Sequence, residues 1–221
     1  IVHFSVKWWR PLHQQESVAE GELENLMLFS LFIGLITFTL LYVWLVLHRL
    51  TDELRAMAAH DPLTRLLNRR GLVDQLDAYF RSRTAGPAYL LIADIDYFKR
   101  INDNHGHKAG DLVLCHVADI LKASARQGDL TCRLGGEEFV IIALNTDKAG
   151  ALQLAERARA AIEQSEVLGS STNQPIRCTV TIGVSAAFTG SQAFDEFTQQ
   201  ADAALYRGKE AGRNRVEWAQ V

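Results

Sequence analysis

Hydrophobic residues are distributed along this chain in two different ways, and the change falls near residue 50. Residues 26–47 contain no charged side chain and are rich in Leu, Phe, Ile and Val. As an α-helix this run is about 33 Å long, at ~1.5 Å per residue, which is enough to cross a bilayer core. A signal peptide has an apolar region of only about 7–15 residues, followed by a small-residue cleavage site. The pattern therefore predicts one transmembrane helix.

The residues that follow the apolar run continue a helical pattern. Their apolar side chains recur at spacings of three, four and three, as in the seam of a coiled coil: Leu47, Leu50, Leu54 and Met57. Fewer than two heptads lie outside the predicted span, so this seam alone predicts a weak dimer. We expect 48–60 to be a helical linker that ends at Asp61-Pro62, because proline disfavours helix at the residue before it.

The remaining part, 61–221, alternates between helical and strand-like periodicity. Helices are predicted over 71–83, 109–126, 148–166 and 194–209. Strands are predicted over 89–95, 130–134, 139–144 and 176–188, with a short one near Val216. About 160 residues are enough for one core, so we predict one α/β domain in which helices cover a sheet.

Net charge and cysteine content indicate which class of partner and which cellular compartment to expect. Residues 1–25 hold two basic and four acidic residues, so −2 of the net charge of −3 falls there and −1 falls elsewhere. No basic surface for nucleic acid is therefore expected. Cys115, Cys132 and Cys178 are isolated in apolar segments without CxxC spacing, which predicts buried thiols in a reducing compartment.

The basic residues near the apolar run indicate its orientation. Two lie before it and three after it, within about 20 positions: Lys7, Arg10, Arg49, Arg55 and Arg65. This small excess favours a cytoplasmic C-terminal side and an extracytoplasmic segment over 1–25. Because the chain begins at Ile1 rather than Met, we also expect further residues upstream.

A Gly-Gly-Glu-Glu motif lies between two apolar runs and predicts a β-hairpin with its tip at Gly135-Gly136. Glycines let a backbone approach a ligand closely. The carboxylates of Glu137 and Glu138 beside them suit a hydrated Mg²⁺ that carries a nucleotide phosphate. A solvated turn is the alternative, and this motif alone does not decide between the two.

Two further groups of polar residues favour the nucleotide interpretation. Asp94 and Asp96 end an apolar strand, where α/β folds place ligand-binding groups, although they share a face only if the strand continues through Asp96. Lys99, Asn102 and Asp111 follow, as expected for a triphosphate and base pocket.

Near the C-terminus, Lys209 and Arg213 are four residues apart, which places them on the same side of a helix. The alternative is an exposed helix end whose cations complement the helix dipole.

Together these motifs resemble the GGDEF family of diguanylate cyclases, from about Asp61 to Glu217. The matching motifs occur in order: Asp61-Pro62-Leu63-Thr64, Asn68-Arg69-Arg70-Gly71, the block from Asp94 to Asp111, Gly135-Gly136-Glu137-Glu138-Phe139, Thr181-Ile182-Gly183-Val184-Ser185, and the ending from Lys209 to Asn214. The resemblance implies a sheet related to the palm of polymerases and nucleotidyl cyclases. It also implies a nucleotidyltransferase that condenses two GTP into cyclic di-GMP and releases two pyrophosphates.

The resemblance implies a role for each matching residue. Asp94 and Glu137, with the Ile95 carbonyl, would bind Mg²⁺, for which Mn²⁺ could substitute. Glu138 would lie beside the metal, and Glu137 is the candidate base for the ribose 3′-hydroxyl, with Glu138 as its rival. The other implied ligands of GTP are Asn102 and Asp111 for guanine, Lys99, Lys209 and Arg213 for the β- and γ-phosphates, and Gly135 and Gly136 for close approach of the nucleotide.

A further match concerns inhibition by the product. Arg126-Gln127-Gly128-Asp129 lies five residues before Gly135-Gly136, the position of the inhibitory site in this family. Arg126 and Asp129 would bind cyclic di-GMP there. Arg157 resembles the second arginine of that site, with Arg159 as a close alternative.

Each domain of this family binds one GTP, and two domains must meet to form the product. The resemblance therefore implies a homodimer, held by one helix in the bacterial inner membrane with its catalytic domain in the cytoplasm. Two alternatives remain at this point. An inactive GGDEF-like domain would be a receptor for GTP or cyclic di-GMP, and a palm-type polymerase or adenylyl cyclase would lack the product site and the guanine pair.

Overall fold

The computed structural model describes residues 25, 28–52, 54, 59–82, 85–168, 175–190 and 194–219. The chain divides into two compact units, Ile1–Arg55 and Ala56–Val221.

The first unit contains a helix over Leu28–Asp52, which by length and composition could cross a membrane. Its most apolar window has a mean hydropathy of 2.3, and none of that window is buried. The helix continues past Leu47, as the seam predicts, and Leu54 is also helical. Met57, the last residue of the predicted seam, lies outside the described residues.

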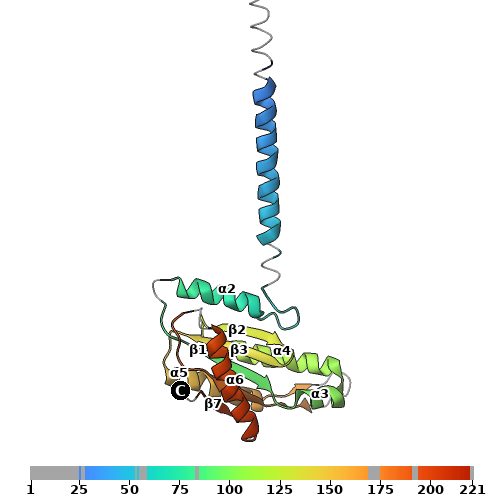
Figure 1. Ribbon diagram of the computed structural model, residues 1–221. Coiled ribbons are helices and arrows are strands. Elements are labelled where there is room, and N and C mark those ends of the chain that lie inside the picture. Colours follow the sequence, from blue (N-terminus) through green and yellow to red (C-terminus); the bar gives the residue numbers. More distant parts are fainter. Residues whose placement is uncertain are drawn as a thin grey trace, which may run out of the picture. The chain divides into compact units, whose positions relative to one another are not determined.

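The second unit is built on a five-stranded sheet with the order β2-β3-β1-β6-β7 (Figure 1). Neighbouring strands are antiparallel, except that β6 and β7 are parallel. The strands are β1 (Ala88–Ile95), β2 (Leu130–Gly135), β3 (Glu138–Leu144), β6 (Val180–Val184) and β7 (Val216–Trp218). A separate pair consists of β4 (Val167–Leu168) and β5 (Pro175–Ile176).

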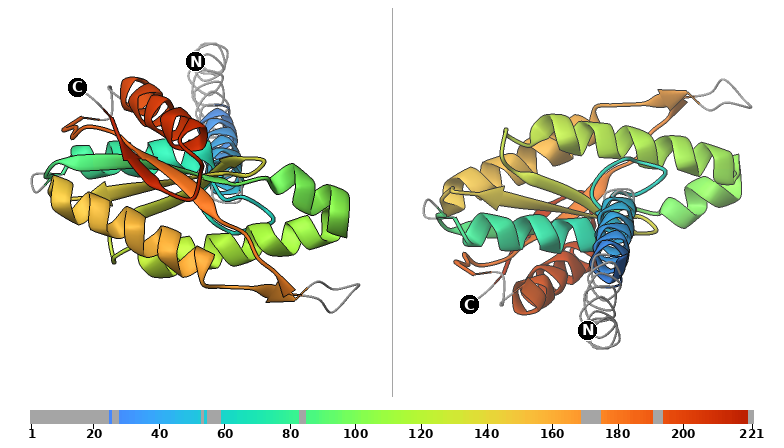
Figure 2. Two further views of the ribbon diagram at one scale, coloured as in Figure 1. Left: turned by 90° about the horizontal axis from the view of Figure 1, so that it is seen from below. Right: turned by 90° about the horizontal axis from the view of Figure 1, so that it is seen from above.

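Helices cover both faces of the five-stranded sheet (Figure 2). They are α2 (Arg69–Phe80), α3 (Phe98–His105), α4 (His107–Ser124), α5 (Lys148–Glu163) and α6 (Phe194–Glu210). The buried side chains of α4 and α5 pack on one face, and those of α2 and α6 on the other. The predicted fold class, a nucleotidyl-cyclase-like sheet covered by helices, is confirmed.

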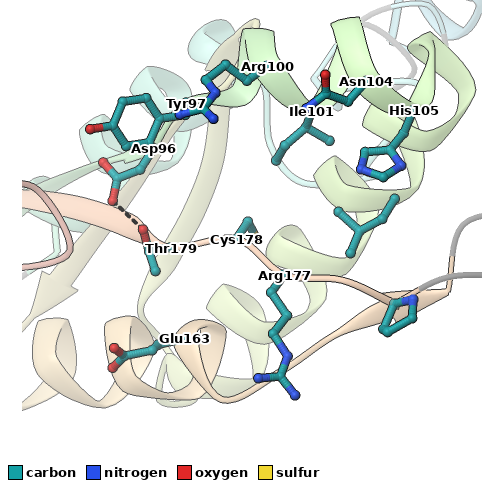
Figure 3. Close-up of a pocket in the computed structure, with 12 residues that line it drawn as sticks. Asp96, Tyr97, Arg100, Ile101, Asn104, His105, Glu163, Arg177, Cys178 and Thr179 are labelled. Atoms are coloured by element: carbon teal, nitrogen blue, oxygen red, sulfur yellow. Dashed lines mark hydrogen bonds between the residues drawn. The ribbon is translucent and has the colours of Figure 1, made fainter.

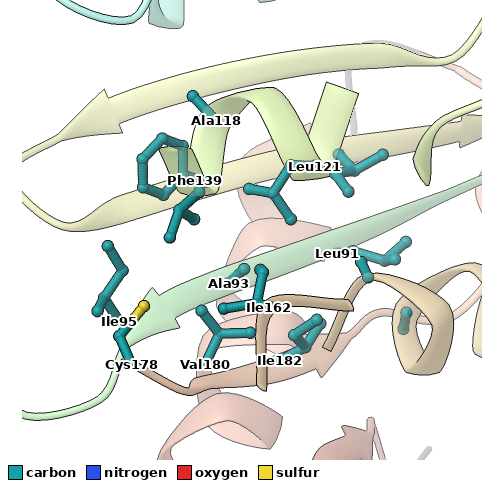
Figure 4. Close-up of a cluster of buried hydrophobic side chains, with 14 of the residues drawn as sticks. Leu91, Ala93, Ile95, Ala118, Leu121, Phe139, Ile162, Cys178, Val180 and Ile182 are labelled. Atoms are coloured by element: carbon teal, nitrogen blue, oxygen red, sulfur yellow. The ribbon is translucent and has the colours of Figure 1, made fainter. Parts of the chain in front are cut away.

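The middle strand, β1, is buried along its whole length. Leu91 and Ile95 belong to the same core cluster as Leu121 of α4 (Figure 4). Leu90 and Ile92 point to the opposite face and join the cluster formed with α2 and α6. Because β1 is packed on both faces, the residues at its C-terminal end are held in fixed positions.

The structure corrects the predicted boundaries. Helices α2, α4 and α5 end two to three residues earlier than predicted. The run predicted as one strand over 176–188 is divided into β5 and β6, because residues 177–179 leave the ladder. Helix α3 was not predicted. It buries only Phe98 and Ile101, too few apolar residues to show a helical period.

Candidate active site

The Gly-Gly hairpin, meaning β2, β3 and the turn at Gly136-Glu137, confirms the predicted hairpin. Its tip lies one residue later than predicted, because Gly135 still pairs with Glu138 after a register shift. Gly136 has a left-handed φ of 52°. A Cβ at this position would meet no atom within 4 Å. Glycine is therefore favoured by the left-handed backbone conformation, and not by a lack of space.

An arginine ties this turn to the beginning of the domain. Arg133 donates to the Gly136 carbonyl from Nε at 3.0 Å and from Nη2 at 2.8 Å. Its Nη1 forms an ion pair with Asp61 at 3.0 Å, and both side chains are largely buried. Burial opposes ionisation of Asp61, but hydrogen bonds from Thr64 and Arg133 outweigh it and lower the pKa of this carboxyl. The beginning of the domain, which directly follows the predicted linker, is therefore coupled to the tip of the hairpin.

Carboxylates from β1 and from the hairpin meet at one edge of the domain. Asp94 lies directly opposite Glu138 in the β1–β3 ladder. The Ile95 amide donates to the Glu137 carbonyl at 3.4 Å, which brings the turn against the end of β1. Lys209 lies 2.9 Å from Asp94, Nζ to Oδ1. The structure thus brings together Asp94, Ile95, Glu137, Glu138 and Lys209, five of the residues to which the family resemblance assigns a role in the site.

Negative charge at this edge is only partly compensated. Burial raises the pKa of Asp94; Lys209 opposes this effect, while the nearby Asp96 adds to it. Partial desolvation also raises the pKa of Glu138, and the neighbouring carboxylates of Asp94 and Asp202 raise it further. A bound cation would stabilise the ionised forms of these carboxyls.

Asp202 is a member of this cluster that sequence reasoning missed. It lies on α6 seven residues before Lys209, two turns of helix away on the same face. Burial raises the pKa of Asp202, and Lys209 partly offsets that shift. The seven-residue spacing was visible in the sequence, but nothing in the sequence shows that α6 packs against β1 and β6.

The carboxylates fit a divalent metal that binds together with a nucleotide. Carboxylate oxygens are hard donors, and Mg²⁺ is commonly held by one or two of them plus water and substrate phosphates. Within the part of the chain that the structure describes, no three His, Cys, Asp or Glu side chains gather in a metal-binding arrangement. A complete all-protein cage is therefore not formed there, whereas a site completed by phosphate oxygens is compatible with these positions.

Asp96 does not belong to the carboxylate cluster. The strand ends at Ile95, so alternation does not place Asp96 on the same face as Asp94. Asp96 is buried, and its carboxylate accepts hydrogen bonds from Thr179 Oγ1, Thr181 Oγ1 and the Asn214 amide, at 2.7, 2.7 and 3.0 Å. These bonds make it a structural link between β1, β6 and the segment after α6, although Asp96 also lines the cavity beside α3.

The predicted guanine pair is close in space. Asn102 lies on α3 and Asp111 on α4, and the two helices are joined at Gly106. A Cβ on Gly110 would collide with Oδ1 of Asn102, so the Asn102 amide lies over the backbone that carries Asp111. Lys99 lies in the first turn of α3, three residues before Asn102.

Arg213 is not on the same helix as Lys209, contrary to the expectation from their spacing. Helix α6 ends at Glu210, and Arg213 follows in a turn with a left-handed φ of 65°. Its guanidinium carbon lies 4.4 Å from the centre of the Tyr97 ring. Tyr97 lies two residues after the end of β1. Burial raises the pKa of Asp94, and the charge of Arg213 opposes that rise. The arginine therefore still lies near the carboxylates.

The predicted product site lies in the loop between α4 and β2. The carboxylate of Asp129 accepts from the amides of Arg126 and Leu144, at 2.8 and 3.0 Å. Arg157 donates to the Ser124 carbonyl at the start of this loop. Arg159 instead binds Glu156, Glu163 and Asn214. The structure thus places Arg157 beside this loop and engages Arg159 elsewhere.

A cavity of about 450 Å³ lies on the side of α3 that faces β5 and the end of α5 (Figure 3). Tyr97, Arg100 and His105 contribute to its α3 wall, and Glu163 and Thr179 to the opposite wall. Neither Asp94 nor the hairpin carboxylates line it.

Comparison with known proteins gives consistent matches. A family model described as "Diguanylate cyclase, GGDEF domain" matches residues 58–215. Over 174 residues the chain is 42% identical to the diguanylate cyclase DgcP of Pseudomonas aeruginosa, a match that covers 78% of this chain and 26% of DgcP. Over 177 residues it is 40% identical to the response regulator PleD of Caulobacter vibrioides, covering 76% of this chain and 39% of PleD. The chain thus spans less than half the length of these relatives.

Two solved structures have the same fold. The GGDEF domain of DgcB from Caulobacter crescentus, in complex with c-di-GMP, has a TM-score of 0.68 and 33% identity, covering 74% of this chain and 94% of that one. The active GGEEF domain of a diguanylate cyclase from Vibrio cholerae has a TM-score of 0.60 and 33% identity, covering 71% of this chain and 99% of that one.

Proposed function

The chain belongs to the GGDEF family of diguanylate cyclases, and on that premise we propose that it is an active nucleotidyltransferase that condenses two GTP into cyclic di-GMP and two pyrophosphates. The observation that carries this proposal is the meeting of Asp94, Glu137 and Glu138 with Lys209 at the end of β1. The Vibrio cholerae domain described as active has the same Gly-Gly-Glu-Glu-Phe motif. Incubation of the chain with GTP and Mg²⁺, followed by product analysis, tests it.

The carboxylates are proposed to hold a divalent cation, Mg²⁺ in our assignment and Mn²⁺ as a substitute. Asp94, Glu137 and the Ile95 carbonyl would be its protein ligands. When bound, such an ion neutralises charge that develops on the phosphate during transfer. Lys209 neutralises Asp94 in this structure. We propose that Lys209 leaves Asp94 for the nucleotide phosphates when the metal and substrate bind.

The remaining site residues are proposed to bind and orient GTP. Asn102 and Asp111 hold the guanine edge, and Lys99 and Arg213 hold the β- and γ-phosphates together with Lys209. The left-handed turn at Gly136 keeps side chains away from the nucleotide. Glu137 is our candidate for the group that accepts the ribose 3′-hydroxyl proton, and Glu138 is its alternative.

Each domain then supplies half of a reaction site, because one domain orients one GTP and its partner must present the second. We propose a homodimer joined through the helix that continues from the apolar run. Leu50 and Leu54 are about half and two-thirds exposed, so apolar surface is available on that helix. The contact from Asp61 through Arg133 to Gly136 offers a physical route from the linker to the hairpin.

Replacing both Leu50 and Leu54 with lysine should weaken this association, because like charges would face each other across the seam. We expect turnover per chain to fall about tenfold or more in dilute protein and to recover as the concentration rises. Dilution series of activity, beside sedimentation analysis, measure this. Thr51→Lys adds a charge off the seam and is the matched control. Equal rates per chain at every concentration in both proteins would show that the helix is only a tether.

The helix over Leu28–Asp52 is proposed to anchor the chain in the bacterial inner membrane, with the second unit in the cytoplasm. Its length and apolar composition support the anchor. GTP is a cytoplasmic metabolite, which fits the orientation favoured by the basic residues after the apolar run. Accessibility of an engineered C-terminal tag to protease in intact spheroplasts tests the orientation.

The loop over 126–129 is proposed to bind cyclic di-GMP and inhibit the enzyme, with Arg157 as the second arginine. Among the described residues the Arg126 guanidinium has no hydrogen bond or ion pair, whereas Asp129 is engaged by two backbone amides. Arg126 is therefore the cleaner residue to test, since Asp129 also shapes the loop.

Arg126→Ala should weaken product binding roughly ten- to a hundredfold, because charged hydrogen bonds contribute about 1.5–3 kcal/mol. The initial rate should change little, and the final product level should rise. Calorimetry with cyclic di-GMP and progress curves measure both effects. Lys122→Ala, which removes a cation from the last turn of α4, is the control. Unchanged product affinity in Arg126→Ala would exclude a role for this loop in product binding.

A further inference from the structure

Tyr97 has an unusual position for a large aromatic residue. It precedes α3 with a left-handed backbone, at φ 57° and ψ 30°. Bulky residues seldom adopt this conformation, so its occurrence needs a local reason. The side chain is 53% exposed, so core packing does not supply one. In Figure 3 the ring stands at the edge of the cavity, with its hydroxyl directed away from the cavity.

The side chain of Tyr97 instead contacts Arg213. The guanidinium carbon lies 4.4 Å from the ring centre, within the range of a cation–π interaction. Arg213 also donates from Nη1 to the Tyr97 hydroxyl at 3.2 Å. One tyrosine therefore fixes the arginine by both its ring and its hydroxyl, which defines the direction of the guanidinium as well as its position.

The backbone of Arg213 is held independently of Tyr97. Both Arg213 and Asn214 have left-handed φ angles, 65° and 46°. The Arg213 amide donates to the Gly208 carbonyl at 2.9 Å, and the Asn214 amide donates to buried Asp96 at 3.0 Å. The Asn214 side chain is bound by Glu163 on α5 at 2.7 Å. With the backbone fixed, only the side-chain torsions of Arg213 remain to be ordered.

Tyr97 orders these torsions without neutralising the arginine. Lys209 forms an ion pair with Asp94. A side chain held in this way must leave its carboxylate partner before it can bind phosphate. Within the described ranges Arg213 forms no ion pair with a carboxylate, although its charge acts on Asp94 from a longer distance, and its Nε and Nη2 make no hydrogen bond. An aromatic ring and a hydroxyl acceptor thus leave the charge and most donors of Arg213 available for an anion.

We propose that Tyr97 is a positioning residue that holds the guanidinium of Arg213 ready for the terminal phosphates of the nucleotide. The assignment of Arg213 to phosphate rests on the proposed function. Tyr97 itself needs no contact with substrate. Its contribution comes from preorganisation, because the rotamer freedom of a long arginine side chain is then lost before binding rather than during it.

Tyr97→Leu should raise the KM for GTP roughly five- to tenfold, since it removes both contacts that order the arginine. The kcat should change less than twofold, because Arg213 holds the phosphates equally in the ground state and the transition state. Tyr97→Phe keeps the ring and should raise KM about twofold. The matched control is Tyr206→Leu, at a tyrosine that is 64% exposed and has no guanidinium contact in the described part of the chain. Steady-state kinetics of the full chain in detergent micelles give these values.

A double-mutant cycle identifies the partner of Tyr97. In an Arg213→Ala background, Tyr97→Leu should change KM less than twofold, because there is no guanidinium left to position. A five- to tenfold rise in both backgrounds would show that Tyr97 acts independently of Arg213, and the proposal would be wrong.

A measurement without substrate separates this proposal from the proposed function. The Nε–H resonance of Arg213, assigned from its loss in Arg213→Ala, should carry a ring-current shift from Tyr97. We expect that shift to disappear in Tyr97→Leu and to persist in Tyr97→Phe. An unchanged resonance in Tyr97→Leu would overturn the positioning contact even if GTP is turned over. If the chain showed the expected shifts but made no cyclic di-GMP, the contact between Tyr97 and Arg213 would be established. Only the proposed activity would then be wrong.

Discussion

Replacing Glu137 with alanine should reduce the conversion of GTP into cyclic di-GMP by about a thousandfold or more. Our assignment makes this carboxylate both a metal ligand and the candidate base, so one substitution removes two contributions. The fold should survive, because Glu137 lies in the hairpin turn and only its backbone carbonyl contacts β1. Chromatography of the nucleotide products measures the loss, and thermal unfolding followed by circular dichroism verifies the fold.

Two further variants make this result interpretable. Glu166→Ala removes an exposed carboxylate that pairs with Arg177 far from the hairpin in sequence, and it should leave turnover unchanged. Glu138→Ala tests which of the two hairpin carboxylates is the base: a milder loss than in Glu137→Ala supports Glu137. Full turnover by Glu137→Ala would remove Glu137 from the metal site.

The enzyme should also prefer GTP to ATP by about three to four orders of magnitude in kcat/KM. A site built to hydrogen-bond particular donors rejects an analogue that lacks them by as much as 10⁴–10⁵, roughly, because its polar groups are left unpaired. Asp111 can accept from the ring N–H and amino group of guanine, which adenine does not offer in that arrangement. The amide of Asn102 lies over Gly110, the residue before Asp111.

Asp111→Asn should lower kcat/KM for GTP by about a hundredfold, since a neutral amide replaces a charged acceptor. The already low rate with ATP should change little. Asp119→Asn lies two turns further along α4 and serves as the control. Equal rates with GTP and ATP in the unmodified chain would show that Asn102 and Asp111 do not read the base.

The parts of the site that were predictable are those fixed by local patterns. The apolar runs on either side of Gly135-Gly136 defined the hairpin, because a strand period and a two-residue turn are visible within 15 positions. The run before Asp94 defined the buried central strand in the same way. Proximity of Asp94 to the hairpin follows from the resemblance to the family, and the β1–β3 register shows it directly.

Other features depend on how distant segments pack, which no local pattern reveals. Asp202 joins the carboxylates only because α6 lies against β1 and β6. Asp96 looked equivalent to Asp94 in sequence, but the strand ends between them, and Asp96 accepts hydrogen bonds from Thr181 of β6 and from Thr179 just before that strand. Arg213 lies beyond the end of α6, so its orientation depends on Tyr97, 116 residues earlier. Tertiary contacts override the helical spacing there.

The central claim is that this chain synthesises cyclic di-GMP from GTP. The most direct test is to incubate the purified full chain, in detergent micelles, with GTP and Mg²⁺ and to quantify both products. The account predicts one cyclic di-GMP for every two pyrophosphates released, with no product from ATP and none after chelation of the metal. Tight GTP or cyclic di-GMP binding without any pyrophosphate release would contradict it and identify the chain as a receptor.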